Sequence, residues 1–329
     1  MKLFVSLYLL GCLPLTALAA PDCVTPNAVT AKVSISHYVA DSTYSTTGLF
    51  APGTQAKLVS KQFEFTEGPA ADNQGNIFFT DQPNNTIWEY DTKGKLSKFA
   101  DSAGRSNGMY FDRRGNLVTC ADANNELWQF KRNGKRETVL MTSFNGKKFN
   151  GPNDLWIDAK GGIYFTDPYY QRPYWTRTAT ELDGQKVYYL PAGSQQARVA
   201  SAQLQKPNGI AGTRDGKYLY VADIQGNKTY RFSIAANGEL INPQIFTDKG
   251  SDGMTLDEQG NVYLTGSKGV YIFSPDGKQI GLIAIAEPWT ANVCFGGRNG
   301  NTLFITASKA IYTFEMKVKG NKKNASGQL

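Results

Sequence analysis

Six positions along the chain place an oxygen-bearing side chain eight residues before a glycine, and an apolar, strand-like run follows each of these glycines. Carboxylate and amide oxygens are the ligands that hard cations prefer, Ca²⁺ above Mg²⁺ or Mn²⁺. A second glycine directly follows four of the six residues, which lets the backbone approach a central ligand closely. We call these six residues the anchors: Glu67, Asn107, Asn153, Asn208, Asp252 and Asn292.

Histidine chemistry is nearly absent from this chain of 329 residues, because His37 is its single histidine and lies outside the anchor segments. This argues against His-based zinc sites and against a Ser-His-Asp nucleophile. Three cysteines remain beyond the first 19 residues, so one disulfide at most can form within the chain. Cys120 and Cys294 lie in apolar runs and are expected to be buried free thiols.

The spacing of the anchors predicts the elements that position them. Successive anchors are 40, 46, 55, 44 and 40 residues apart, and about 40 residues suffice for one four-stranded antiparallel propeller blade. Helical signals are almost absent. We therefore expect an all-β, six-bladed propeller over residues 56–316, in which each anchor begins an inner strand at the central channel. The extended segment 56–63 is expected to supply the outer strand of the last blade and to close the ring.

The two ends of the chain differ from the repeats. Residues 1–19 combine Lys2, an apolar run and a small-residue cleavage site at Ala17-Leu18-Ala19, which is typical of a secretory signal peptide. Residues 20–55 form an N-terminal extension, and residues 317–329 a lysine-rich tail that is expected to be solvated. The protein is accordingly expected to be secreted or periplasmic.

Composition narrows the range of partners. The formal net charge is +7, yet basic residues are not interleaved with aromatic ones as in nucleic-acid binding proteins. No later run is long enough to span a membrane. We expect a small-molecule substrate, with neither a nucleic-acid nor a membrane partner; the sequence leaves the oligomeric state open.

Two interpretations of the anchors stay open from the residues alone. A ring of two carboxylates and four amides is suited to a divalent cation, but it would also line a polar, water-filled channel. For Asn107 and Asn292, orientation of water or substrate and capping of strand starts are equally compatible with the sequence. The aspartates that end second strands are expected to be structural turn residues: Asp81, Asp122, Asp167 and Asp223.

The longest interval between anchors, from Asn153 to Asn208, holds an aromatic and basic insertion. Such a segment could fold over the channel mouth, stack on a sugar ring and attract a carboxylate. Packing between blades is the alternative. The residues predicted to bind substrate are Asn107, Tyr169, Tyr170, Arg172 and Trp175, with Tyr174 and Arg177 in the same insertion.

Around the anchors the sequence resembles the senescence marker protein / gluconolactonase / luciferin-regenerating enzyme group. The similarity covers about residues 56–316, and the motifs that carry it keep the order and spacing of that family: FTEGP (65–69), SNGM (106–109), FNGPNDLWID (149–158), IYFTDPYY (163–170), KPNGI (206–210), SDGM (251–254) and NVCFGG (292–297).

The resemblance implies a six-bladed propeller that binds one divalent cation in its channel, usually Ca²⁺, with Mg²⁺, Mn²⁺ or Zn²⁺ as alternatives. It implies that Glu67, Asn208 and Asp252 bind the metal directly and that Asn153 completes the shell or contacts the substrate. Asp252 and Asn153 are the predicted catalytic residues. The activity implied is hydrolysis of sugar lactones, in which the cation polarises the carbonyl and Asp252 acts as general base or attacks directly.

Three departures from the family pattern bear on the substrate and the metal. Animal lactonases of this group carry an arginine where this chain has Gly151, so the polar contacts to substrate are expected to differ. The channel histidine of the phosphotriesterase relatives is absent near Ser308, and Thr255 replaces the aspartate that holds a second calcium there. The alternative to a lactonase is a non-catalytic binding propeller with a structural cation.

Overall fold

Each repeat has an inner strand that leads into a second strand through a tight turn ending in glycine, and in four of the six the turn is Asp-x-x-Gly. In the first repeat the amide of Gly75 donates to the carbonyl of Asp72 over 3.2 Å, and the Asp72 carboxylate accepts from the amides of Gln74 and Asn76. Gly75 has a φ of 89°, a region that residues with a Cβ rarely occupy. The same turn occurs in other repeats, for example at Asp112 and Asp158.

In the computed structural model these hairpins extend into four-stranded antiparallel sheets. The structure describes residues 46 and 48–321, all within one compact unit. The first three sheets are β2 (Thr66–Ala71), β3 (Ile77–Asp81), β4 (Thr86–Tyr90) and β5 (Leu96–Asp101); β6 (Ser106–Phe111), β7 (Leu117–Ala121), β8 (Glu126–Phe130) and β9 (Arg136–Met141); and β10 (Leu155–Ile157), β11 (Ile163–Asp167), β12 (Lys186–Leu190) and β13 (Arg198–Ser201).

The remaining three sheets complete a six-bladed β-propeller, and every regular element of the described residues is a strand. They are β14 (Pro207–Gly212), β15 (Tyr218–Asp223), β16 (Lys228–Ile234) and β17 (Leu240–Thr247); β18 (Met254–Leu256), β19 (Val262–Gly266), β20 (Gly269–Phe273) and β21 (Gln279–Ala284); and β22 (Thr290–Gly296), β23 (Thr302–Ala307), β24 (Ala310–Glu315) and β1 (Lys57–Ser60).

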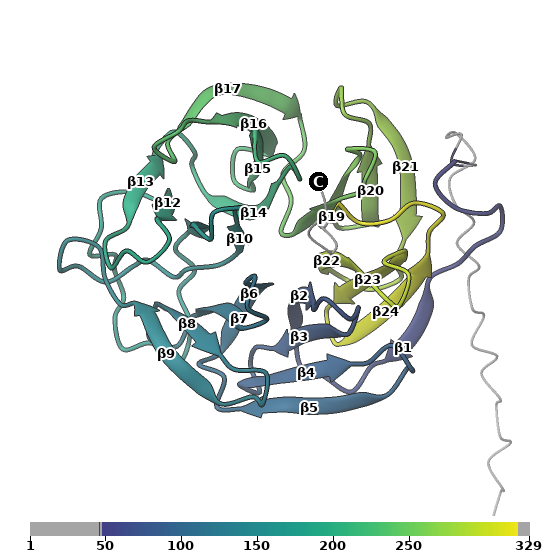
Figure 1. The fold of residues 1–329 in the computed structure, drawn as a ribbon, viewed down its shortest axis with the longest axis horizontal. Coiled ribbons are helices and arrows are strands. Elements are labelled where there is room, and N and C mark those ends of the chain that lie inside the picture. The colour runs from purple at the N-terminus through teal and green to yellow at the C-terminus, as the bar shows by residue number, and fades with distance from the viewer. Residues whose placement is uncertain (1–45, 47, 322–329) are drawn as a thin grey trace, which may run out of the picture. The chain divides into compact units, whose positions relative to one another are not determined.

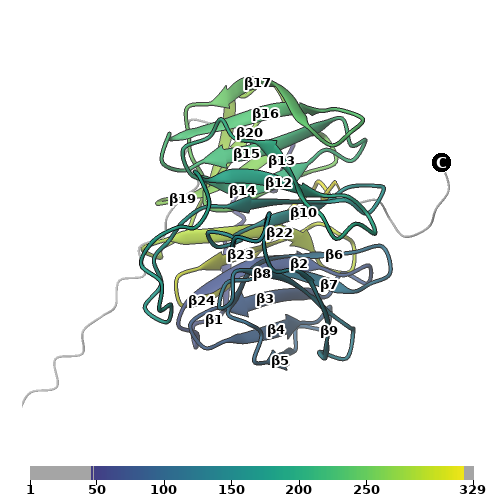
Figure 2. The same cartoon turned by 90° about the vertical axis from the view of Figure 1, so that its left-hand side faces the viewer.

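The ring closes as the sequence predicts. β1 pairs antiparallel with β24 as the outer strand of the last blade, so the first and last parts of the propeller share one sheet. Figure 1 shows the sheets around a central axis, with β2, β6, β14 and β22 near the centre. In the side view of Figure 2 they follow one another from β5 at one edge to β17 at the other.

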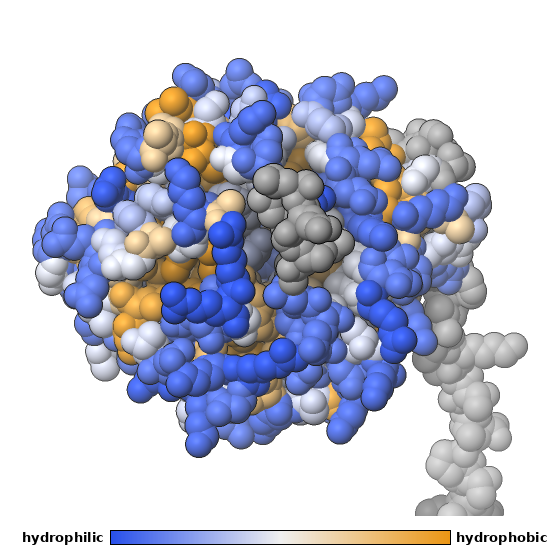
Figure 3. Space-filling model, in the orientation of Figure 1, coloured by the Kyte–Doolittle hydropathy of each residue, from blue (hydrophilic) through white to orange (hydrophobic). Residues whose placement is uncertain are grey.

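The core lies between neighbouring blades. Aromatic side chains of adjacent sheets meet edge to face, as do Phe78 of β3 and Phe111 of β6, with ring centroids 5.0 Å apart. Cys120 and Cys294 are buried free cysteines, as expected. Figure 3 shows one face of the molecule with a largely hydrophilic surface and a recess near its centre.

The start of the predicted solvated tail is instead docked on the propeller. Val318 is buried, the backbone of Lys319 exchanges two hydrogen bonds with Glu258, and Gly320 forms a β-bridge with Asp257. Gly320 and Asn321 line a cavity of about 70 Å³ within the channel. Asn321 donates to the carbonyl of Gly212 over 3.1 Å, which ties the segment to the fourth blade. Residues 317–321 therefore belong to the fold.

The predicted signal peptide (1–19), His37, Cys23 and the end of the tail lie outside the described residues. Within the described part of the chain, no helix is long and apolar enough to cross a membrane.

Candidate functional site

All six anchors lie at the inner edge of the blades, either in the inner strand or just before it. Glu67, Asn107, Asn208 and Asn292 are in β2, β6, β14 and β22, whereas Asn153 and Asp252 precede β10 and β18. Five are buried, and Asp252 is half-buried. Neighbouring inner strands contact one another around the axis. The structure thus brings the anchors together as a ring, as the repeat spacing predicts.

Local irregularities in the strands coincide with the anchors. In β2 the pairing moves from Glu67↔Thr80 to Ala70↔Phe78, so the register shifts just after the anchor. Equivalent shifts surround the anchors of β6, β14 and β22. A bulge re-aims side chains relative to a regular strand. Threonines of the second strands accept hydrogen bonds from backbone amides that the bulges leave unpaired. For example, the backbone amide of Asn292 donates to Thr306 Oγ1 over 3.0 Å.

The glycines that follow the anchors let adjacent inner strands come into contact. A Cβ on Gly253 would lie 2.1 Å from Cγ of Asn292, and one on Gly108 would lie 2.3 Å from Oδ1 of Asp154. Both distances are far below van der Waals contact. The backbone at each of these glycines therefore lies directly against the neighbouring anchor segment of the ring. An alanine at either position would push the two segments apart.

Asp252 is held by hydrogen bonds at both carboxylate oxygens. Asn208 Nδ2 donates to Oδ1 over 2.8 Å, and the indole Nε1 of Trp289 donates to Oδ2 over 2.6 Å. The same Asn208 amide nitrogen also donates to the Tyr170 hydroxyl over 3.0 Å. Charge-assisted bonds of this kind fix the orientation of a carboxylate and favour its ionised form.

A second group of anchors surrounds Asp154. Asn292 Nδ2 donates to Glu67 Oε2 over 3.2 Å and lies 3.5 Å from Asp154 Oδ2. The backbone amide of Gly68 also donates to Glu67 Oε2, over 2.7 Å. Asn153 joins two blades through its backbone, since its carbonyl accepts from the amide of Gly108 over 2.7 Å.

The ring concentrates negative charge in a buried place. Burial is the main cause that raises the pKa of Glu67 well above its usual value, and the charges of Asp252 and Asp154 raise it further. Burial likewise raises the pKa of Asp154 to about 7 and the pKa of Asp252 above its ordinary range. Three carboxyl groups that share a buried site cannot all ionise cheaply unless positive charge joins them.

These residues have the chemistry of a hard-cation site. The side-chain oxygen Oδ1 of Asn208 is buried and has no hydrogen-bond partner, although its Nδ2 makes two bonds. An orphaned amide oxygen beside clustered carboxylates fits a cation ligand. Within residues 46 and 48–321, no three His, Cys, Asp or Glu side chains form a metal cluster by themselves. A cation here would therefore depend on amide as well as carboxylate oxygens.

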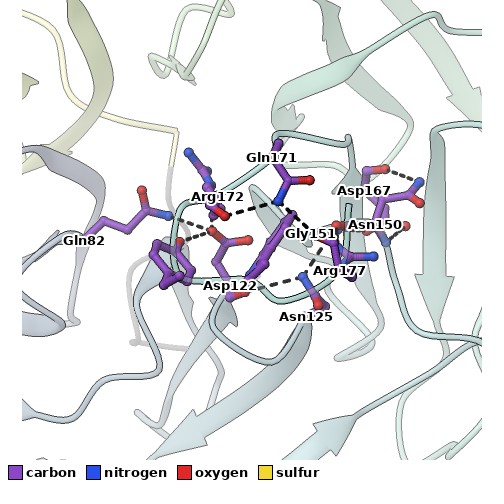
Figure 4. Close-up of polar contacts among 11 residues, drawn as sticks. Gln82, Asp122, Asn125, Asn150, Gly151, Asp167, Gln171, Arg172 and Arg177 are labelled. Atoms are coloured by element: carbon purple, nitrogen blue, oxygen red, sulfur yellow. Dashed lines mark hydrogen bonds and ion pairs between the residues drawn. The ribbon is translucent and has the colours of Figure 1, made fainter. Parts of the chain in front are cut away.

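Residues 168–185, between β11 and β12, form what we call the mouth insertion, on the face where the inner strands begin. Arg172 Nε donates to Asp122 Oδ2 over 2.8 Å, and the hydroxyl of Tyr174 donates to the same oxygen over 2.5 Å. Gln82 Nε2 donates to it over 3.3 Å from the first blade. Figure 4 shows Gln82 and Arg172 converging on Asp122, which secures the insertion to the second blade.

The predicted substrate-binding residues differ in whether their side chains contact the ring of anchors. Tyr170 reaches the ring through Asn208, and burial raises the pKa of Asp252 although the nearby charge of Arg172 offsets part of that rise. Tyr169 contacts Gln171 and the ring of Trp175. Trp175 covers Gly151, where a Cβ would lie 3.0 Å from the indole. Asn107 is buried in β6.

Sequence reasoning missed three residues of the site. Asp154 follows an anchor directly, and its position in the PND motif was the available signal. Trp289 has no repeat equivalent that would have indicated its contact with Asp252. Asp122 was expected to be a turn residue like its equivalents, and Asp81, Asp167 and Asp223 do accept from backbone amides at the start of their blades. Asp122 departs because its carboxylate binds the mouth insertion instead.

Fold and site together define a class: six-bladed propellers whose inner strands present a ring of carboxylates and amides. The chain belongs to the SMP-30/Gluconolactonase/LRE-like family, whose model matches residues 65–309. It is 28% identical to a gluconolactonase of Zymomonas mobilis, over 93% of this chain and 95% of that protein.

Two further relatives show how far the similarity extends. The diisopropyl-fluorophosphatase of Loligo vulgaris is 28% identical over 57% of this chain and 64% of its own length. The solved structure of a gluconolactonase from Xanthomonas campestris superposes with a TM-score of 0.74 at 25% identity, covering 79% of this chain and 88% of that one. The family resemblance and the fold predicted from the sequence are thus confirmed.

Proposed function

We propose that this protein is a divalent-cation-dependent hydrolase that opens sugar lactones. The observation that carries the proposal is the ring itself, in which buried Glu67 and Asp154 and half-buried Asp252 share one site with an unsatisfied amide oxygen of Asn208. A bound cation would stabilise the ionised form of these clustered carboxylates. The gluconolactonases among its relatives support lactones as the substrates.

The residues proposed to hold the cation are Glu67, Asn153, Asn208 and Asp252. Their oxygen donors favour Ca²⁺, with Mg²⁺, Mn²⁺ and Zn²⁺ as alternatives. When bound, the cation would polarise the lactone carbonyl and stabilise the developing oxyanion.

The proposed general base is Asp252, whose orientation is fixed by Asn208 and Trp289. Asp252 accepts a proton from the attacking water while the water oxygen bonds to the lactone carbonyl carbon. The ring C–O bond then breaks, and the departing alkoxide takes that proton from Asp252. The product is the open hydroxy acid. Asn153 completes the donor set or positions the substrate, as Asn107 does from the second blade.

The mouth insertion is proposed to position the sugar. Tyr170 presents its ring beside Asn208, and aromatic faces stack on sugar rings. Arg172 supplies a charged donor at the same place, and Tyr169 and Trp175 form the body of the insertion. We also propose that residues 1–19 direct secretion, which N-terminal sequencing of protein recovered outside the cytoplasm would test.

The proposal is tested by hydrolysis of gluconolactone and galactonolactone after the protein has been stripped of metal with chelator. Activity should return with Ca²⁺ and should fall by roughly a hundredfold or more in Asp252→Asn, the range for loss of a general base. Thermal melting should show that the variant is folded. Cation binding without turnover of any lactone or ester would instead identify a binding propeller with a structural cation.

A further inference from the structure

Two cationic side chains from different segments lie on the ring of one tyrosine at the channel mouth. Lys206 Nζ is 3.9 Å from the centroid of the Tyr170 ring, and the guanidinium carbon of Arg172 is 5.5 Å from it. The hydroxyl of Tyr170 accepts from Asn208, one of the anchors. One aromatic ring therefore separates the two cations from the proposed catalytic site.

The two cations differ in how their charge is balanced. Arg172 is paired with Asp122, which is itself almost fully buried. None of the ion pairs between described residues includes Lys206, although its side chain is half-buried. Lys206 thus adds a positive charge that no ion pair between described residues balances, and the ring of Tyr170 lies beneath it.

A neutral sugar lactone has no negative charge to pair with Lys206. A ligand that carries a carboxylate or phosphate away from its ester could place the ester at the anchors and the anion at Lys206 and Arg172. Ammonium and guanidinium groups form strong charge-assisted bonds to such anions. The Asp122 carboxylate holds Arg172 in place for this contact.

Building on the proposed function, we propose that the preferred substrates are anionic lactones, whose carboxylate or phosphate is bound by Lys206 and Arg172 beside Tyr170. A lactone of an aldaric acid is the simplest member of this class, because one carboxyl forms the ring ester while the other stays free.

The first test compares two lactones that share a five-membered ring. Glucono-1,4-lactone ends in a hydroxymethyl group, whereas glucaro-1,4-lactone ends in a carboxylate. For the wild-type protein, kcat/KM should be about tenfold or more higher for the anionic lactone. In Lys206→Met, which keeps the apolar stem on Tyr170 but removes the charge, the ratio should fall toward one.

A matched control is available in the next blade. Lys249 Nζ lies 3.7 Å from the ring centroid of Tyr271, so it repeats the lysine-on-tyrosine contact on β20, the third strand of that blade. Lys249→Met should leave the preference for the anionic lactone unchanged. An equal loss in both variants would assign the preference to the general positive field of the protein and would overturn the proposal.

A binding measurement separates this inference from the proposed function. Methyl galactoside, methyl galacturonoside and galactose 6-phosphate differ mainly in the group at C6, and none is a lactone. Calorimetry should show tighter binding of the anionic sugars to the wild type than to Lys206→Met, and their order distinguishes carboxylate from phosphate. Binding of this kind without lactone turnover would refute only the proposed function. Lactone turnover with no anion preference in either assay would refute only this inference.

Discussion

At the scale of single residues, hydrogen bonds fix the orientation of Asp252. Its two carboxylate oxygens accept from Asn208 and from Trp289. A carboxylate with both oxygens held has one orientation to offer a water molecule, and preorganisation of this kind lowers the barrier to proton transfer. Trp289 therefore acts through Asp252 as a positioning residue.

Trp289→Phe should keep the aromatic packing and remove the donor to Asp252 Oδ2. A hydrogen bond to a charged group contributes about 1.5–3 kcal/mol, which corresponds to roughly a tenfold to hundredfold loss in kcat/KM. The loss should appear mainly in kcat, together with a shifted pH–rate profile. Trp88→Phe is the control, since Trp88 Nε1 donates to Thr86 Oγ1 in β4, away from the anchors. Equal effects of the two variants on activity would contradict the positioning role.

At the scale of elements, the mouth insertion is attached to the second blade through Asp122. Three side chains from two segments donate to Asp122 Oδ2, and Trp175 Nε1 donates to its backbone carbonyl over 2.8 Å. The equivalent Asp223 binds the backbone amides of Gln205 and Lys206 in its own blade. The same repeat position thus fixes the mouth insertion in one blade and a strand start in another.

Asp122→Asn should loosen the insertion, because it removes the ionic partner of Arg172. We expect KM for lactones to rise by about tenfold, the scale of one charge-assisted bond, and cleavage by trypsin after Arg177 to become faster. Asp223→Asn should lower the melting temperature without making this site more sensitive. Unchanged KM and proteolysis in Asp122→Asn would show that the insertion is held by other contacts.

Repetition explains what the sequence could predict at this scale. The Asp-x-x-Gly turns and the eight-residue spacing predict the hairpins, the six blades and the ring of anchors, because each depends on residues close together in the chain. The bulge at Glu67 carries no such signal, since it depends on the pairing of two strands. The contacts of Asp122 with Arg172 and of Trp289 with Asp252 join residues 50 and 37 positions apart. Only the assembled fold brings these together.

At the scale of the whole molecule, the docked segment 317–321 extends the propeller beyond its last strand. Val318 is buried with Met316 and Phe314 against the last two blades, and Asn321 bridges to Gly212. The sequence predicted a solvated tail because lysines alternate there with other residues. The segment is docked instead because the residues between the lysines bury an apolar side chain and form backbone hydrogen bonds.

A chain that ends at Met316 should melt several degrees lower than one that ends at Asn321. Burial of a valine side chain alone contributes about 1.5–3 kcal/mol, and 1 kcal/mol corresponds to roughly 2–4 °C for a domain of 150–250 residues. The chain that ends at Asn321 is the control, because it lacks only residues outside the described part. Equal melting temperatures would show that the docked segment adds no stability.

The raised pKa values predict how stability varies with pH. Asp154 has a pKa of about 7 in the folded protein and an ordinary value near 4 when unfolded, so the folded state binds more protons between these limits. Its contribution to stability is therefore present below about pH 4 and lost as the pH rises through 7. Burial of Glu67 and Asp252 acts in the same direction.

In chelator, the melting temperature should consequently fall more steeply between pH 5 and 8 for the wild type than for Asp154→Asn. Added Ca²⁺ should raise the melting temperature more at pH 8 than at pH 5, because it stabilises the ionised carboxylates. Scanning fluorimetry across this range measures both effects. A Ca²⁺ effect that is largest at pH 5 would contradict the proposed electrostatics of the ring.

The central claim is that one cation in the ring makes the propeller a lactonase. The most direct measurement is a titration of metal-stripped protein with Ca²⁺, in which bound metal and the initial rate of gluconolactone hydrolysis are followed together. The rate should rise in proportion to occupancy and saturate at one Ca²⁺ per chain, and Glu67→Gln should weaken binding and activity in parallel. Full activity in the stripped protein, with no bound cation, would contradict the central claim.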